Sequence, residues 1–475
     1  MKDTDKQRNV KTLKAASWYT ISNFLSKCML YLFTPLYTRV LSKVEYGLYN
    51  NYLSWQSILV VVLTLDLGAT VAIAYIDYKD PKKFHQYIGT ISFLSLVVPL
   101  FFGIIMLVFS QQFSQLFGMA PVYILFIVIS MCMTNALQIF QAEQQSKVQY
   151  KLSSALTLGA AAGNMLLTLL FVWLFRDKLL GVVLGGIIGT AVVNCSVYFY
   201  VFRRSFCVKG EYVRYALRIA LPLLPHMVSS ILLGSSTKIL ITRFCGTEDT
   251  AFYSVVNNCA MVVLLFVNSV NTAWVPWFFN RMDNKDYASV QKVTRVTIPL
   301  VGLCALAVCL AGPEVVLVIG GASYAPAVRM IPPMIFSCVV RYVYTLYVNI
   351  EFYNKKTGGI SIGTVITALA HISLNIVLLR LFNYQAAAYT MLLSELLLLI
   401  IHMFIVKKQG MWHVFNNRQN ILLLAVAGVA CMCILLVYPV PILRYGIIAA
   451  AFVAVVVAVV KFRAQILGLL KKLKK

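Results

Sequence analysis

The chain has 475 residues, of which 60% are hydrophobic and 12% are charged, and its mean hydropathy is +0.81. Its 41 Lys and Arg outnumber its 16 Asp and Glu, which gives a formal net charge of +25 at pH 7. These values exclude a soluble enzyme, because no polar stretch is long enough to fold as a separate aqueous domain. The sequence therefore predicts an all-α integral membrane protein.

A membrane-spanning helix needs about 20 mostly apolar residues, because the hydrocarbon layer is ~30 Å thick. By this measure about fourteen segments are predicted to span the membrane. They are 15–38, 48–74, 87–109, 121–140, 152–174, 180–201, 217–241, 251–273, 290–311, 326–349, 358–380, 386–406, 420–438 and 442–460. Prolines at 222 and 225 in the seventh segment and at 332 and 333 in the tenth are predicted to bend those helices.

Lys and Arg are concentrated in alternate loops, and loops of this kind stay in the cytoplasm. Examples are the loop with Lys79, Lys82 and Lys83 and the stretch from Arg203 to Arg218. Both termini are therefore predicted to be cytoplasmic. The same spread of charge argues against nucleic acid as a partner, because a patch that binds phosphate backbones is concentrated on one folded surface.

Several positions after the first predicted helix recur after the seventh at one constant offset. Thr38, Arg39, Glu45 and Tyr49 correspond to Thr242, Arg243, Asp249 and Tyr253. This pattern predicts two six-helix lobes, residues 1–205 and 206–410, related by a pseudo-twofold axis along the membrane normal. Residues 411–475 add two further transmembrane helices and a basic tail. Two such lobes can rock about a central cavity and expose it to each side in turn.

The first helix of each lobe has a polar face. Helix 1 carries Asn23 and Lys27, and helix 7 carries His226 and Lys238, in both cases at helical spacing. A charged group inside the bilayer costs ~2.5–3.5 kcal/mol on insertion scales, so it usually faces a cavity or a partner. The alternatives for Lys27 are an ion pair with Asp66 or extension toward the membrane surface.

Amides and aromatic rings extend these faces on the second helix of each lobe. Helix 2 adds Asn51 and Trp55, and helix 8 adds Asn268 and Asn271. Amides donate and accept hydrogen bonds at once, which suits a cargo rich in hydroxyl groups. The alternative for each amide is an interhelical hydrogen bond that only stabilises the bundle.

Arg39 and Arg243 begin outer loops and are further candidates to bind cargo. The alternative for each is a structural contact, to Glu45 for the first and to Asp249 for the second.

Asp66, Glu351 and Glu395 are the candidates to carry H⁺ or Na⁺ if transport is coupled to an ion, although a paired or helix-end carboxylate is the simpler interpretation. No cofactor is predicted, and the His and Cys residues lack the spacing of metal ligands.

Several segments resemble one known family. The segment from Ser17 to Asn50, SWYTISNFLSKCMLYLFTPLYTRVLSKVEYGLYN, is similar to the opening of the Wzx-type oligosaccharide flippases. The segments LPLLPHMVSS, SSTKILITRF, FYSVV and NTAWVPWFF agree with the same family. These flippases are the polysaccharide biosynthesis branch of the multidrug/oligosaccharidyl-lipid/polysaccharide (MOP) exporter superfamily, and the resemblance covers essentially the whole chain.

The resemblance implies a two-lobe inner-membrane transporter that moves undecaprenyl-diphosphate-linked oligosaccharide units from the cytoplasmic to the outer leaflet. Such units are used to assemble O-antigen, capsule or other surface polysaccharide. The partners implied are the lipid-linked oligosaccharide, membrane lipids and polysaccharide polymerase or export machinery.

The resemblance also implies a cationic cavity formed mainly by helices 1, 2, 7 and 8. The matching residues are Lys27, Arg39, Lys238 and Arg243. Helix 7 reads Ser-Thr-Lys at 236–238 where many relatives have an acidic residue, which argues against a coupling step that depends on a carboxylate there.

Two other functions stay open at this point. A cation/drug antiporter of the same fold would need an anionic cavity, whereas the proposed faces carry more Lys than Asp or Glu. A membrane polysaccharide polymerase or ligase would need a substantial outer loop with acid/base groups, and the loop from Ser110 to Ala120 has no ionisable side chain.

Overall fold

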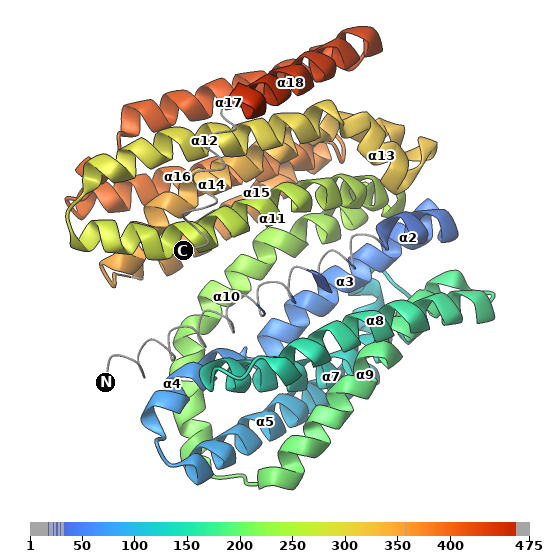
Figure 1. The fold of residues 1–475 in the computed structure, drawn as a ribbon. Helices are drawn as coiled ribbons and strands as arrows, with labels where there is room; N and C mark the ends of the chain where they lie inside the picture. Colours follow the sequence, from blue (N-terminus) through green and yellow to red (C-terminus); the bar gives the residue numbers. More distant parts are fainter. Residues whose placement is uncertain are drawn as a thin grey trace.

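The computed structural model describes residues 33–356 and 358–461, together with Trp18, Ser22, Leu25, Ser26 and Met29. Every regular element within these residues is a helix, which confirms the predicted all-α membrane fold. The helices form two groups in Figure 1, with α10 running between them. We call the group α2–α9 the first lobe and the group α10–α18 the second lobe.

The helices of the first lobe are α2 (Thr34–Val40), α3 (Lys43–Thr64), η1 (Leu67–Thr70), α4 (Val71–Asp77), α5 (Pro81–Val108), α6 (Ser110–Phe117), α7 (Pro121–Ser146), α8 (Lys151–Leu174) and α9 (Lys178–Ser205). Those of the second lobe are α10 (Gly210–Phe244), α11 (Thr247–Asp283), α12 (Tyr287–Leu310), α13 (Gly312–Gly320), η2 (Ala322–Met330), α14 (Ile331–Tyr353), α15 (Gly358–Leu381), α16 (Ala386–Lys408), η3 (Trp412–Val414), α17 (Asn417–Val437) and α18 (Pro441–Lys461).

Eleven helices of the described part are long and apolar enough to cross a membrane, or up to twelve if the bent pair at the end of α3 counts as one span. The first predicted span, 15–38, lies largely outside the described residues. In α18 the shorter apolar stretch Pro441–Ala450 is found. The number fourteen therefore stays a prediction.

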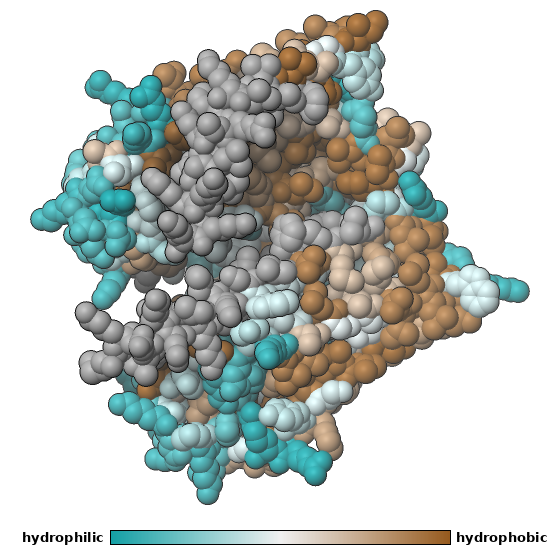
Figure 2. All heavy atoms as spheres, in the orientation of Figure 1, coloured by the Kyte–Doolittle hydropathy of each residue, from teal (hydrophilic) through white to brown (hydrophobic). Residues whose placement is uncertain are grey.

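The loops with most of the Lys and Arg lie at one end of the bundle, which we call the basic end. They are the connections α4–α5, α7–α8, α9–α10, α11–α12, α14–α15 and α16–α17, each taken with the helix ends beside it. Hydrophilic side chains gather mainly at the left in Figure 2, and a brown hydrophobic surface covers the middle of the molecule. This arrangement fits a bilayer around the middle of the molecule. That the basic end lies in the cytoplasm stays a prediction from the loop charges.

The predicted span 48–74 is broken rather than continuous. Helix α3 ends at Thr64, and the chain continues after the break at an angle of 46°. Leu65 and Asp66 occupy the break with positive φ angles of 55° and 43°, in the left-handed region that Asp tolerates better than most residues. Hydropathy alone does not reveal such a break.

The two proline pairs behave differently. Pro222 and Pro225 lie inside α10, where they remove backbone donors as expected. Pro332 and Pro333 are predicted inside a helix, whereas they lie in the first turn of α14 directly after η2, and a bend there stays a prediction. Backbone N–H groups have no intrahelical partner there, so a proline removes no hydrogen bond.

Helices α8 and α9 pack closely because α9 has a glycine at every fourth position along one face. A Cβ atom on Gly185 would lie 2.5 Å from Thr168 Cα, and one on Gly189 would lie 2.4 Å from Asn164 Cα. Small residues at this spacing let two membrane helices approach at backbone distance. The contact fixes Asn164 beside a cavity described below.

Candidate functional site

Lys238 of α10 lies between the two lobes. Its Nζ donates a hydrogen bond to Asn50 Oδ1 of α3 over 3.1 Å, and Asn50 Nδ2 donates in turn to the Tyr46 carbonyl oxygen. Within the described residues Lys238 forms no ion pair with a carboxylate. A half-buried ammonium group with one neutral partner has hydrogen-bonding capacity left for an anion.

The lobes touch at the end opposite the basic end. Asn258 Nδ2 of α11 donates to Thr34 Oγ1 over 3.1 Å and to the Tyr46 hydroxyl over 3.3 Å. Lys43 Nζ at the start of α3 lies 2.6 Å from Glu248 Oε1 of α11. These contacts close the interface at that end.

The lobes approach each other closely at Gly47 of α3. A Cβ atom there would lie 1.7 Å from the Thr247 carbonyl oxygen at the start of α11. Only a residue without a side chain fits between these two helices. Gly47 is therefore part of the interface that holds this end shut.

Toward the basic end the lobes separate. One large buried apolar cluster includes residues of both lobes, such as Tyr46 and Tyr253. Near the basic end the buried residues of the first lobe form a separate cluster, to which the second lobe adds only Tyr212, Ala216 and Ala220 of α10 among its described residues. Among the described residues, the interface is therefore closed at one end and divided at the other.

A polar cavity of about 310 Å³ lies inside the first lobe, among α3, α7, α8 and α9. Its polar lining is formed by amides and hydroxyls, with no charged side chain. These residues are Tyr49, Tyr52, Gln56, Ser130, Thr134, Gln138, Gln141, Asn164, Thr190 and Asn194. A smaller cavity of about 190 Å³ shares Ala160, Asn164 and Thr190 with it and extends to Ser26 of the first predicted span.

Sequence reasoning missed this cavity, although part of its signal was present. The segment NALQIFQAEQQ (135–145) places several amides in a helix that the topology puts in the membrane. Which of them share a cavity depends on how four helices pack, and a single sequence does not show this.

Only some of the candidate residues of the first helix and the outer loops have described positions. Asn23 and Lys27 lie outside the described residues. Arg39 and Arg243 are exposed, and neither forms an ion pair within the described part of the chain. The alternative contact of Arg39 to Glu45 is not formed there, because Glu45 accepts from the Ser42 N–H and caps α3.

Asn51 and Trp55 both lie against α6 inside the first lobe. Asn51 is fully buried, and its Nδ2 donates to the Phe117 carbonyl oxygen over 2.7 Å. The Trp55 ring stacks on the Phe117 ring with centroids 4.2 Å apart. The structure therefore gives both residues a packing contact, and their predicted role toward cargo stays a prediction.

The candidate residues of α10 and α11 differ in their surroundings. His226 is half-buried, and its Nδ1 has no hydrogen-bond partner among the described residues. Asn268 is exposed, whereas Asn271 Oδ1 accepts from Asn349 Nδ2 of α14 over 2.9 Å. Asn271 thus makes the interhelical hydrogen bond that was the alternative to cargo binding.

Two of the three candidate coupling carboxylates are paired inside the second lobe. Glu351 is fully buried and contacts His402 Nδ1, and Glu395 Oε1 lies 3.2 Å from Arg341 Nη1. Asp66 lies at the break between α3 and η1 and is half-buried. The pairing is the simpler interpretation given for these carboxylates, and their coupling role stays a prediction.

His371 of α15 is a buried polar centre that the sequence did not single out. Its Nε2 is 2.8 Å from Thr237 Oγ1 of α10, and its Nδ1 is 2.8 Å from Ser394 Oγ of α16. Asn375, one helical turn later, donates to the same Nε2 over 3.1 Å. This network joins three helices directly beside Lys238, and the His–Asn pair at a spacing of four was its only sequence signal.

These features define a multi-span, all-helical membrane protein with two lobes. Residues 12–282, more than half of the chain, match the family described as "Polysaccharide biosynthesis protein". The chain belongs to this family, as its segments from Ser17 to Phe279 led us to expect.

A curated relative and several solved structures are similar to this chain. "Lsg locus putative protein 1" of Haemophilus influenzae is 20% identical over 412 residues, which are 84% of this chain and 99% of that protein. The structure titled "Lipid II flippase MurJ, inward closed conformation" has a TM-score of 0.73 at 12% identity and covers 92% of this chain and 99% of its own.

An inward-facing multidrug resistance MATE family transporter of the MOP superfamily has a TM-score of 0.63 at 11% identity, with coverage of 81% and 97%. At these identities the structural likenesses show the fold alone. This member of the polysaccharide biosynthesis family therefore shares its fold with these two structures.

Proposed function

We propose that this protein flips polyprenyl-diphosphate-linked oligosaccharide from the cytoplasmic to the outer leaflet of the bacterial inner membrane. Surface polysaccharide assembly would consume the product. The observation that carries the proposal is Lys238, a cation between the lobes with only an amide partner in the described part of the chain.

The charge of Lys238 suits a diphosphate. A diphosphate that enters a poorly hydrated interface without a cation loses hydration with no compensation. Lys238 can replace that hydration by a charge-assisted hydrogen bond, and Asn50 can move from the ammonium to a sugar or phosphate oxygen. Lys27, Arg39 and Arg243 are proposed to add positive charge along the same path.

The amide-lined cavity of the first lobe suits sugars. Gln56 and Gln138 line it and have no hydrogen-bond partner among the described residues, so their amides are available to hydroxyl groups. A cavity of about 310 Å³ is at the lower end of the size of ligand pockets and would hold part of an oligosaccharide. The polyprenyl tail would stay in lipid.

The closed end and the divided end support an alternating-access mechanism. In this conformation cargo would enter from the basic, cytoplasmic end. Separation of Gly47 from Thr247 and closure at the basic end would then expose the site to the other side. The coupling ion would be carried by Asp66, Glu351 or Glu395.

A cation/drug antiporter of the same fold is the second candidate, and the structural likeness to the MATE transporter supports only the shared fold. Its cargo would need an anionic site at the interface. Lys238 has the opposite charge, which favours an anionic cargo.

The test replaces Lys238 in cells whose surface polysaccharide depends on this protein. Lys238→Gln should lower export about 10- to 100-fold, because a hydrogen bond to a charged group contributes ~1.5–3 kcal/mol. Lys238→Arg should retain much of the activity. Lys292→Gln, which removes an exposed charge from α12, is the matched control and should export normally. Full export by Lys238→Gln at normal protein levels would contradict the proposal.

A further inference from the structure

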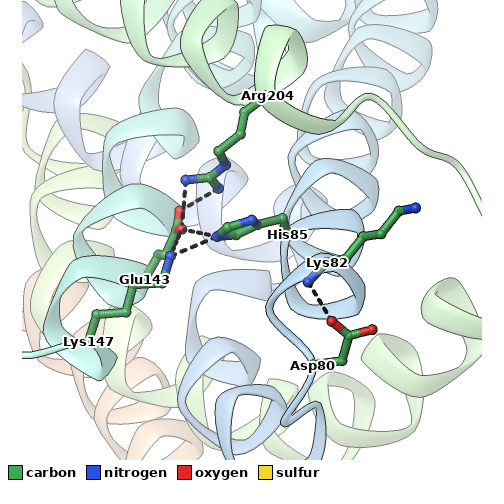
Figure 3. Close-up of polar contacts among 6 residues, drawn as sticks. All are labelled: Asp80, Lys82, His85, Glu143, Lys147 and Arg204. Carbon is green, nitrogen blue, oxygen red and sulfur yellow. Dashed lines mark hydrogen bonds and ion pairs between the residues drawn. The ribbon is translucent and has the colours of Figure 1, made fainter.

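A second group of cations surrounds a buried carboxylate at the basic end of the first lobe. Glu143, near the end of α7, is fully buried. Lys147 Nζ lies 2.6 Å from Glu143 Oε1, and Arg204 Nη2 of α9 donates to Oε2 over 3.0 Å. His85 Nε2 of α5 lies 3.9 Å from Oε1. Figure 3 shows these side chains converging from three helices.

The positive charge at this place exceeds what Glu143 can neutralise. Lys147 Nζ also donates to His85 Nε2 over 3.0 Å, so that nitrogen accepts a hydrogen bond and the ring is neutral. One carboxylate therefore faces two full cations. Lys151, at the start of α8, adds a third and forms no ion pair within the described residues. These cations have too few anionic partners, so binding of an anionic ligand would stabilise the cluster.

These cations line an open pocket of about 570 Å³. Lys147, Lys151 and Arg204 lie on its wall together with Leu152 and Tyr200, whose side chains are 54% and 48% exposed. Charged and exposed apolar side chains thus lie side by side in one pocket. In a membrane protein, such a boundary lies at the level of the lipid head groups.

The pocket is separate from the interface that holds Lys238. It lies among α5, α7, α8 and α9 of the first lobe, and its lining includes no residue of the second lobe. Its ligand therefore need not be the transported molecule.

We propose that this pocket binds the phosphate or diphosphate group of a lipid head group. Lys151 and Lys147 contact the phosphate oxygens, and Arg204 holds Glu143 in place through Nη1 and Nη2. Leu152 and Tyr200 contact the upper part of the lipid chains. The assignment goes beyond the transport function and does not depend on the identity of the cargo.

Lys151 gives the cleanest test, because its side chain is exposed and its loss breaks no ion pair of the described structure. Lys82→Gln is the matched control: Lys82 is an exposed lysine of the same basic end, and Figure 3 shows its side chain pointing away from Glu143. Both variants lose one charge, so non-specific attraction to an anionic surface changes equally in both.

The experiment measures binding of short-chain phosphatidic acid to the purified full chain in phosphatidylcholine nanodiscs. Lys151→Gln should weaken binding ~5-fold, because one Lys near a membrane surface contributes about that factor, and Lys151→Arg should restore it. Lys82→Gln should bind as the parent does. Equal weakening by Lys151→Gln and Lys82→Gln, or no preference for phosphatidic acid over phosphatidylcholine, would overturn the assignment.

Inorganic diphosphate distinguishes a site for the phosphate of a lipid head group from a site for a free phosphate anion. Competition with phosphatidic acid that is lost in Lys151→Gln would support a phosphate site at this pocket. Tight binding of diphosphate without any binding of phosphatidic acid would overturn the assignment to a lipid. Lys238→Gln should leave phosphatidic acid binding unchanged, so failure of this inference and failure of the transport proposal give different results.

Discussion

The contact between Gly47 and Thr247 predicts that one added methyl group shifts the conformation of the transporter. In Gly47→Ala the new Cβ would lie 1.7 Å from the Thr247 carbonyl oxygen, where ordinary van der Waals contact begins at 3.4 Å, so the two helices must separate by the difference of about 1.7 Å. Overpacking of this kind costs ~1–3 kcal/mol in the closed arrangement. Alanine itself favours α3 by up to ~1 kcal/mol, so the helix should still form.

A conformation in which the lobes are apart at this end would not bear that cost. Its population relative to the closed state should therefore rise ~5- to 150-fold. Spin labels at Leu174→Cys and Leu381→Cys, on the exposed ends of α8 and α15, report the distance between the lobes there. Gly159→Ala, with open space around its Cβ position, is the control and should leave the distances unchanged. Distances in Gly47→Ala that match the parent protein would refute the reasoning.

Two further substitutions test the first lobe. Glu143→Gln leaves Lys147 and its neighbours without a counter-charge in a mostly buried place and should lower the free energy of unfolding by about 3 kcal/mol, measured by thermal unfolding. The exposed Glu211→Gln should have little effect, and an equal loss in both would contradict the role of the buried carboxylate. Gln138→Leu removes a cavity amide and should slow oligosaccharide transport in vesicles several-fold at unchanged stability, whereas Gln115→Leu on exposed α6 should transport normally.

Much of the fold could be predicted from hydropathy and loop charge. The boundary expected between the lobes lies in the connection between Ser205 of α9 and Gly210 of α10, and the division into two repeated lobes stays a prediction. Helices α10 and α11 extend beyond the predicted spans because their ends are polar and leave the apolar layer. A hydropathy ruler measures only the part of a helix that lies in lipid.

Features that depend on contacts between distant segments could not be predicted. Lys238 stood out as a cation in a membrane helix, but its partner Asn50 is 188 residues away in the sequence. The need for glycine at position 47 comes from its contact with α11, which the local sequence does not show. The break at Asp66 depends on two backbone conformations, and the sequence around it is apolar enough to suggest one straight helix.

The central claim is that a cation between two lobes carries a lipid-linked diphosphate across the membrane. Its most direct test is reconstitution of the full chain in proteoliposomes with a fluorescent polyprenyl-diphosphate-linked sugar, whose accessibility on each leaflet is followed over time. Transport by the parent protein, a loss of about 10-fold or more in Lys238→Gln and little transport of cationic dyes are the predicted results. Movement of cationic dyes but not of the lipid-linked sugar, or equal rates for the parent and Lys238→Gln, would contradict the account.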